Sequence, residues 1–245
     1  MFLHGWGVNS RIWRQQAKHF SDHYRVTTID LPGHGESDWQ PIDLDVLAEE
    51  MLILFDEIGV SRMYAVGSSF GGMVALKLIE KDERRVTRLT LVGSQPRFCA
   101  GKDYPFGLEE VRINKLAGQL EHQYPTMVHI FFRSLFTKHE RRTRRYRWIQ
   151  TFRKTDSIPR KEALLHTLDI LRQADLRPVL EGLKIPVQFI NGTEDYICRR
   201  EIYEYCRRVQ PRARFDWFER CGHFPFLIFP HDFNRLLSDF LKEER

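Results

Sequence analysis

The stretch YAVGSSFGG, residues 64–72, decides how the rest of the chain is interpreted. It begins as a short apolar run, passes through Gly-x-Ser-x-Gly at Gly67, Ser69 and Gly71, and continues into a second apolar run, residues 73–78. A strand that turns sharply into a helix needs glycines where backbones meet closely, and it holds the central serine strained with its hydroxyl exposed. Ordinary Gly/Ser turns also show this pattern, so its meaning depends on partners elsewhere in the chain.

Length and composition restrict the class of protein. With 245 residues, of which 42% are apolar and 29% charged, the chain can bury one large core, or a core with an insertion. No apolar run approaches the roughly 20 residues that a membrane span needs, and the beginning of the sequence lacks the features of a signal peptide. We therefore expect a cytoplasmic protein without membrane contact. The four cysteines show no C-x-x-C spacing, which predicts reduced thiols and no metal site.

Strand and helix patterns alternate in the first part of the chain. Strands are expected at residues 1–3, 25–30, in the run before Ser69 and at 86–93, with helices at 11–20, at 47–58 after a cap at Asp43 or Asp45, and after Ser69. This rhythm implies a parallel sheet with helices on both faces. The pair Gly33 and Gly35 does not complete a dinucleotide fingerprint, because Asp38 stands where the third glycine should be. We expect no cofactor.

The alternation stops between residues 95 and 183. Helical patterns follow one another there, at residues 108–124, 127–136, 139–152 and 159–174. Alternation then resumes with a strand at 187–191, a helix at 200–209, a strand at 213–218 and a final helix through 233–241. We interpret residues 95–183 as a helical lid inserted into a core made of residues 1–94 and 184–245.

An acid and a histidine follow the last two expected strands. Asp195 ends the segment GTED, and His223 stands in CGHFP. Because the carboxyl ends of parallel strands meet at one edge of a sheet, both are expected beside Ser69. A serine hydroxyl is a weak nucleophile at neutral pH, but His223 can take its proton and Asp195 can stabilise the imidazolium that forms. The chain order Ser, Asp, His is the one expected for this kind of turn, so we predict a catalytic triad.

Two other groups compete for these roles. Glu194 is the alternative acid, but Asp195 lies farther beyond the strand; His4 is the alternative base, but beside the Gly-rich loop 5–7 it is expected to pack structurally. We predict an oxyanion hole from the backbone N–H groups of Phe70 and Trp6, with the Trp6 indole as a wall of the pocket.

With these residues assigned, the chain resembles the α/β-hydrolase superfamily over its whole length. The matching segments are HGWG at 4–7, DLPGHG at 30–35, GSSFGG at 67–72, GTED at 192–195 and GH at 222–223. The resemblance implies an α/β fold with a mostly parallel sheet and a helical lid. Members usually carry an antiparallel hairpin before the strand that ends at His4. We expect this hairpin to be missing, with about six strands and residues 25–29 at an edge; a start codon assigned too far downstream would explain this equally well.

Within the superfamily, the chain is similar to the carboxylesterases of biotin synthesis that demethylate pimeloyl-[acyl-carrier protein] methyl ester. The shared features are the loop 4–7 leading to Trp13-Arg14, the segment 93–98 entering the lid and the segment 175–177 leaving it. The resemblance implies that lid residues 131–135 line the acyl channel. The substrate-binding candidates are Trp6, Phe70, Phe131, Phe132, Leu135 and His223.

Positive charge is concentrated in the lid. The segment 133–161 holds eleven basic and two acidic residues, a net charge of +9, whereas the whole chain has +5. A basic face beside the active-site mouth suits a substrate carried on an acidic protein such as acyl-carrier protein. The docking candidates are Arg141, Arg142, Arg144, Arg145 and Arg147. The alternative is a solvated helical face; nucleic acid binding is not expected, because no binding motif accompanies the charge.

These observations favour a monomeric ester hydrolase. Ser69 would attack the ester carbonyl, methanol would leave, and water would release the acid. One alternative is a small-molecule carboxylesterase or a hydrolase of carbon–carbon bonds with the same machinery. Another is a non-catalytic module that binds a ligand or a carrier protein. Dehalogenases and epoxide hydrolases of this fold are disfavoured, because they use Asp where this chain has Ser69.

Overall fold

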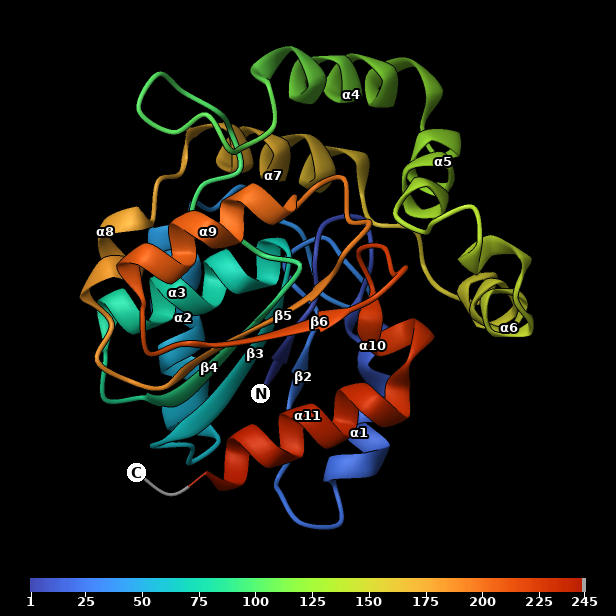
Figure 1. Cartoon of the computed structure of the whole chain (residues 1–245). Helices are drawn as coiled ribbons and strands as arrows, with labels where there is room; N and C mark the ends of the chain where they lie inside the picture. The colour runs from blue at the N-terminus through green and yellow to red at the C-terminus, as the bar shows by residue number, and fades with distance from the viewer. Residues whose placement is uncertain (244–245) are drawn as a thin grey trace.

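One parallel sheet forms the centre of the computed structural model, which describes residues 1–243 (Figure 1). Within those residues the sheet has six strands in the order β2-β1-β3-β4-β5-β6, and every neighbouring pair is parallel. The strands are β1 (Phe2–Leu3), β2 (Thr28–Ile29), β3 (Met63–Ser68), β4 (Val86–Val92), β5 (Val187–Gly192) and β6 (Arg214–Phe218). The predicted parallel sheet of about six strands is confirmed.

Helices cover both faces of the sheet. Helices α1 (Arg14–Phe20) and α11 (Pro230–Lys242) lie on one face, and α2 (Leu44–Glu57), α3 (Phe70–Lys81) and α9 (Arg200–Val209) on the other (Figure 1). The side chain of Asp43 caps α2 by accepting the Val46 N–H, which decides between the two predicted caps. Because both faces are covered, the second halves of β3 and β4 are buried on both sides of the sheet.

The strand at one edge of the sheet is shorter than predicted. Residues 25–29 do lie at this edge, but only Thr28 and Ile29 pair with β1. The expectation of a strand over 25–30 was wrong in length because β1 offers only Phe2 and Leu3 as partners. Local β-propensity alone does not extend a strand beyond its hydrogen-bonded partner.

Residues 95–183 are here called the insertion. Its helices are α4 (Glu110–Gln123), α5 (Thr126–Ser134), the 3₁₀ turn η2 (Glu140–Arg142), α6 (Arg144–Arg153), α7 (Lys161–Gln173) and α8 (Arg177–Gly182). Helices α4 to α7 lie over one end of the sheet, whereas α8 packs against α3 beside the sheet (Figure 1). The single helix expected at 139–152 is instead η2 followed by α6. The break occurs at Thr143, whose extended backbone leaves its side chain free to accept the Tyr146 N–H and start α6 anew.

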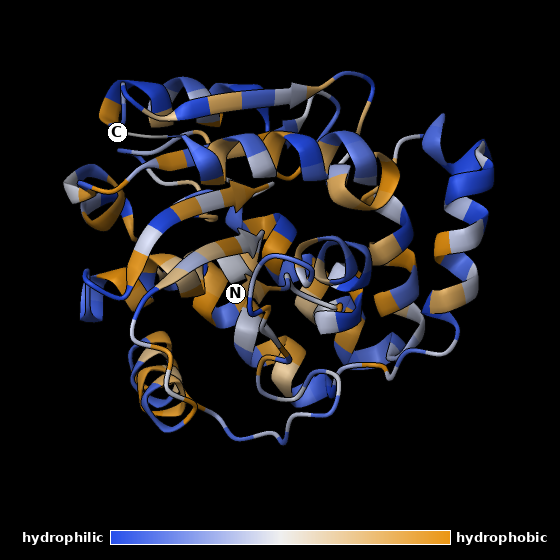
Figure 2. Cartoon of the chain, turned by 90° about the horizontal axis from the view of Figure 1, so that it is seen from below, coloured by the Kyte–Doolittle hydropathy of each residue, from blue (hydrophilic) through white to orange (hydrophobic). Residues whose placement is uncertain are grey.

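Two short helices complete the fold, η1 (Ser10–Trp13) and α10 (Pro225–Ile228). Hydrophobic residues concentrate on the strands and the adjoining sides of the helices, while hydrophilic residues dominate the outer surface (Figure 2). All four cysteines are buried and unpaired, as predicted. Within residues 1–243, none of the helices has the length and apolar character required to cross a bilayer.

Candidate active site

Ser69 occupies a strained turn between β3 and α3. Its backbone φ of 52° and ψ of −120° are unusual for a residue other than glycine. Neighbouring groups hold it there: the Ser69 N–H donates to the Val92 carbonyl at 2.9 Å, and the Ser94 hydroxyl donates to the Ser69 carbonyl at 2.7 Å. The predicted sharp strand-to-helix turn is therefore present, and its strain is maintained by surrounding contacts.

The glycines around Ser69 allow the backbones of β3, α3 and the end of β1 to approach closely. A Cβ atom at Gly67 would lie 2.5 Å from the Gly71 carbonyl oxygen and from Gly72 Cα. A Cβ atom at Gly71 would lie 2.5 Å from the carbonyl oxygens of Leu3 and His4. Since the obstructing atoms belong to the backbone, no side-chain rotation can relieve either clash.

Gly67→Ala should therefore lower the free energy of unfolding by about 3 kcal/mol or prevent folding, as expected for overpacking against rigid backbone. Gly118 provides the matched control, because nothing lies within 4 Å of a Cβ atom placed there in the middle of α4. Gly118→Ala should raise stability by about 0.5–1 kcal/mol, the usual helix preference for alanine. Urea unfolding of both variants tests this, and equal stability of the two would contradict the close-packing argument.

Asp195 and His223 form a buried hydrogen-bonded pair. The Asp195 carboxylate accepts from His223 Nδ1 at 2.7 Å, and its other oxygen accepts the N–H groups of Ile197 at 2.8 Å and Cys198 at 3.2 Å. Both side chains are buried. Glu194, the alternative acid, is exposed and makes no contact with the imidazole among the described residues. The structure thus brings together the predicted acid and base.

Ser69 and His223 line the same cavity, but no hydrogen bond joins them within residues 1–243. The pair Asp195–His223 is thus in contact before the nucleophile engages. Hydrogen bonds of this kind are often long in free enzymes and shorten when substrate is bound.

His4 plays a structural part instead. Its Nε2 accepts the Leu31 N–H at 2.9 Å, so Nδ1 carries the proton and donates to the Gly5 carbonyl at 2.8 Å. Burial, with a smaller contribution from His34, lowers the pKa of His4 to about 3. A neutral imidazole with both nitrogens engaged cannot serve as the general base.

Asp195, Cys198 and His223 place ligand-type atoms within 4.8 Å of one another. These atoms already have partners, because Asp195 binds His223 and the Cys198 thiol donates to the Gly93 carbonyl at 3.0 Å. Burial also raises the pKa of Cys198 well above its ordinary value, which keeps the thiol protonated. The arrangement suits an acid–base pair better than a metal centre.

The predicted oxyanion donors belong to two backbone segments near Ser69. The Phe70 N–H begins α3, and the Trp6 N–H belongs to the loop after β1; neither has a hydrogen-bond acceptor among the described residues. Free N–H groups at a helix start favour negative charge. The Trp6 indole is fixed by donating to the Leu164 carbonyl at 2.9 Å and by an edge contact with Phe131 at 4.7 Å.

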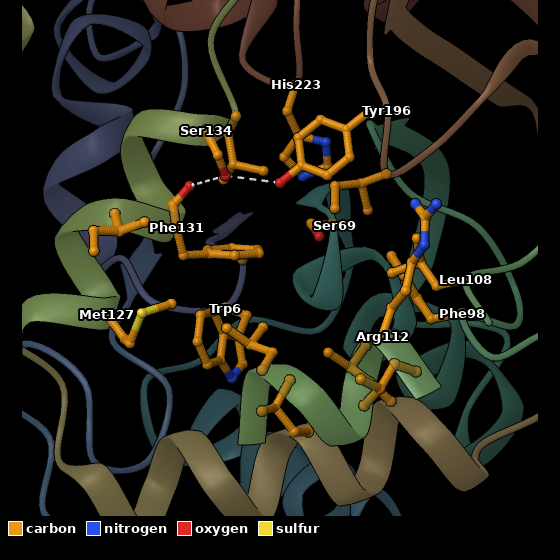
Figure 3. A pocket seen from close by; sticks show the side chains of 18 of the residues that line it. Trp6, Ser69, Phe98, Leu108, Arg112, Met127, Phe131, Ser134, Tyr196 and His223 are labelled. Carbon is orange, nitrogen blue, oxygen red and sulfur yellow. Dashed lines mark hydrogen bonds between the residues drawn. The ribbon is translucent and has the colours of Figure 1, made fainter. Parts of the chain in front are cut away.

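A cavity of about 240 Å³ opens above Ser69. Most of its wall is apolar, and Figure 3 shows Trp6, Phe131 and Met127 on one side with Phe98 and Leu108 on the other. Ser134 and Tyr196 hydrogen-bond at 2.7 Å beside the opening. Arg112, which lies beside Phe98 and Leu108 in Figure 3, and Gln119 are further polar residues of the lining.

Two predicted substrate-binding side chains do not line this cavity. Phe132 points to the opposite side of α5, packing against Phe136 and Phe224 beneath the Arg153 guanidinium. Phe70 is buried in the core, leaving only its backbone near Ser69. Trp6, Phe131, Leu135 and His223 do line it. Phe132 does not face the cavity because of helical geometry. The cavity-lining residues of α5 are 127, 130, 131 and 134, and residue 132 does not lie on the helix face that these positions share.

Comparison with known proteins identifies the family. The sequence model described as alpha/beta hydrolase fold matches residues 1–230. The chain belongs to the α/β hydrolase family. It is 32% identical to a pimeloyl-[acyl-carrier protein] methyl ester esterase of Nitrosomonas europaea, covering 95% of this chain and 91% of that protein. It is 30% identical to the protein of that name from Photorhabdus laumondii, covering 100% of this chain and 92% of the relative.

Solved structures agree on the fold of this α/β hydrolase. An esterase from Exiguobacterium antarcticum matches with a TM-score of 0.88 and 24% identity, over 99% of this chain and 91% of the other. An enol-lactonase from Burkholderia xenovorans matches with a TM-score of 0.87 and 23% identity, over 99% and 90%. The protein is therefore a hydrolase by family, with the predicted fold confirmed.

The candidate docking arginines of this hydrolase differ in exposure. Arg142, Arg144 and Arg147 are exposed. Arg145 is half-buried, donates to the Leu227 carbonyl and the Gln15 side chain, and stacks on Trp148 at 4.4 Å. Arg141 is also half-buried and donates to the Arg133 carbonyl at 3.4 Å. Of the predicted docking residues, Arg145 therefore uses its long side chain to join the insertion to the core.

Proposed function

We propose that this hydrolase is a cytoplasmic serine carboxylesterase that demethylates pimeloyl-[acyl-carrier protein] methyl ester in biotin synthesis. Ser69, Asp195 and His223 would form its catalytic triad. The observation that carries the proposal is the buried Asp195–His223 hydrogen bond beside a strained serine at the base of an apolar cavity. The names of the relatives from Nitrosomonas europaea and Photorhabdus laumondii support the choice of substrate.

Each step of ester hydrolysis has a candidate group in this site. His223 Nε2 takes the proton as Ser69 Oγ attacks the ester carbonyl carbon, while Asp195 stabilises the imidazolium through Nδ1. The N–H groups of Trp6 and Phe70 donate to the oxyanion. His223 then returns the proton to the leaving methanol. Water, deprotonated by the same imidazole, attacks the acyl-enzyme, releases the carboxylic acid and regenerates Ser69.

The apolar cavity suits a methylene chain. Trp6, Phe131 and Leu135 offer carbon surface and no unpaired polar group, so burying an acyl chain there is favourable by roughly 25 cal/mol for each Å² removed from water. We propose that the insertion acts as a lid that supplies most of this wall, while Trp6 belongs to the loop after β1. The exposed arginines 142, 144 and 147 would receive the acidic carrier protein.

Variants of the adjacent residues Phe131 and Phe132 should separate an effect on substrate binding from an effect on stability. Phe131→Ala should raise KM for a nitrophenyl octanoate roughly tenfold, because it removes part of the apolar contact with the chain, and should change the acetate little. Phe132→Ala should instead lower the free energy of unfolding by about 3–5 kcal/mol, as for a core phenylalanine, with KM unchanged. Steady-state kinetics and urea unfolding of both variants measure this. The assignment of the acyl wall fails if the two variants behave alike.

Side-by-side assays of methyl pimeloyl-carrier protein and free short-chain esters test the function directly. A kcat/KM higher on the carrier-linked ester supports the proposal. Preference for free esters would favour a small-molecule esterase. Absence of turnover on every ester would favour a carbon–carbon hydrolase or a binding module.

A further inference from the structure

Glu140 of the insertion is a buried acid in a strongly basic segment. Only 2% of the residue is exposed, and it forms no ion pair within the described part of the chain, although arginines follow it directly. Its carboxylate instead accepts two backbone N–H groups, from Thr137 at 2.6 Å and from Gly222 at 3.0 Å. A buried carboxylate held by backbone donors is a strong and directional contact.

Half of this arrangement is local. The Thr137 hydroxyl accepts the Glu140 N–H at 3.0 Å, while Glu140 accepts the Thr137 N–H, which is the reciprocal pattern of a capping box. A capping box explains why an acid stands at the start of η2. It does not explain the contact with Gly222, which lies 82 residues away and immediately precedes His223.

The loop that carries His223 is held at three consecutive residues. The Cys221 carbonyl accepts the Glu194 N–H at 2.8 Å, from the loop of the catalytic acid. The next two contacts come from the insertion: Gly222 donates to Glu140, and the His223 N–H donates to the Leu135 carbonyl at 2.9 Å. Residues 135–140 thus hold the backbone at Gly222 and His223 through two hydrogen bonds.

The packing at Gly222 leaves little freedom. A Cβ atom there would lie 2.5 Å from the Leu135 carbonyl oxygen and 3.1 Å from the Glu140 carboxylate. The insertion therefore touches the peptide next to His223 directly, with no side chain between them. This close packing leaves little room for the peptide before His223 to shift.

We propose that Glu140 is a positioning residue for His223. By holding the Gly222 N–H, it sets the backbone from which the imidazole reaches Ser69 while Nδ1 stays on Asp195. The inference rests on the proposed function, since it takes His223 as the general base. It makes the insertion part of the catalytic frame and not only a cover for the acyl chain.

Four variants assayed on nitrophenyl butyrate test this role. Glu140→Ala should lower kcat by roughly 100-fold, the scale of a 1 Å misplacement, with KM unchanged. Glu140→Gln keeps one acceptor oxygen and should recover part of the loss. Thr137→Val is the matched control: it removes the other half of the capping box and shares any loss of thermal stability, but it keeps the Gly222 contact and should keep kcat. His223→Ala should be inactive.

The proton NMR signal of the His223 Nδ1–H, measured in the same variants, reports the imidazole directly. It should shift or broaden in Glu140→Ala and stay in place in Thr137→Val. An equal loss of kcat in Thr137→Val and Glu140→Ala would overturn the inference, because Glu140 would then only support its own turn. Full kcat in Glu140→Ala would overturn it too.

Two further outcomes keep the experiment decisive. If Glu140→Ala does not fold, Glu140→Gln is compared with Thr137→Val instead. A larger loss of kcat in Glu140→Gln supports the positioning role of Glu140, and equal losses reject it. Retained activity in His223→Ala would reject the proposed function itself. Inactive His223→Ala together with normal Glu140 variants would reject only the positioning role.

Discussion

Ser69→Ala and His223→Ala should each reduce kcat on a nitrophenyl ester by roughly 10⁶-fold, because the nucleophile and its base act as one unit. Asp195→Asn should lose roughly 10⁴-fold, since the amide reverses the polarity of the hydrogen bond to Nδ1 and favours the wrong tautomer. The Asp195–His223 contact at 2.7 Å is the structural basis for this expectation. Stopped-flow and steady-state assays with purified variants measure both losses.

The double variant Ser69→Ala, His223→Ala should be hardly slower than either single one, because removing one member already stops the joint step. Ser68→Ala is the matched control for the nucleophile. Ser68 is adjacent and fully buried, and its hydroxyl has no hydrogen-bond partner within residues 1–243. Removing an unsatisfied buried hydroxyl, so that the side chain becomes a methyl group, should leave activity and stability intact. Turnover within tenfold of wild type in Ser69→Ala would remove the case for a serine nucleophile.

Reversing charge at Arg142, Arg144 and Arg147 to Glu should lower kcat/KM on the carrier-linked ester by roughly 10- to 1,000-fold, the range of electrostatically steered association. All three side chains are exposed. Their attraction to an acidic carrier must therefore be screened by salt, as the Debye length falls from about 10 Å at 0.1 M to about 3 Å at 1 M. Wild-type activity on the carrier substrate should fall with added salt, and the variant should respond much less.

The same triple variant should hydrolyse free nitrophenyl butyrate almost normally, because the catalytic groups are untouched. The control variant replaces Arg62, Arg84 and Arg212 with Glu, so its net charge is the same. These three arginines are exposed, and they precede β3, β4 and β6, at the end of the sheet opposite Ser69. This control should retain carrier activity. Equal losses of activity on both substrates would mean that arginines 142, 144 and 147 only support the insertion. No loss of activity on either substrate would mean that they form a solvated basic face without a docking role.

The alternating apolar segments were sufficient to predict the sheet. Runs such as β3 and β4 are buried on both faces, and the helices between them follow from local spacing alone. The two errors in the elements have different causes. Strand β2 stops at two residues because its distant partner β1 is short. The helix expected over 139–152 breaks at a local feature, the side-chain cap of Thr143 on α6, which the helical spacing of the apolar residues does not reveal.

The sequence by itself determined that Ser69, Asp195 and His223 lie at one edge, because parallel strands leave their carboxyl ends together whatever the side-chain detail. Only the tertiary structure decided which side chains around them face the cavity or become fixed in the core. Phe131 lines the cavity while Phe132 does not, Arg145 is tied to the core while Arg147 is exposed, and Glu140 holds the Gly222 N–H. These choices depend on how the insertion packs against loops far away in sequence, and burial and hydrogen bonding across such distances leave no pattern in adjacent residues.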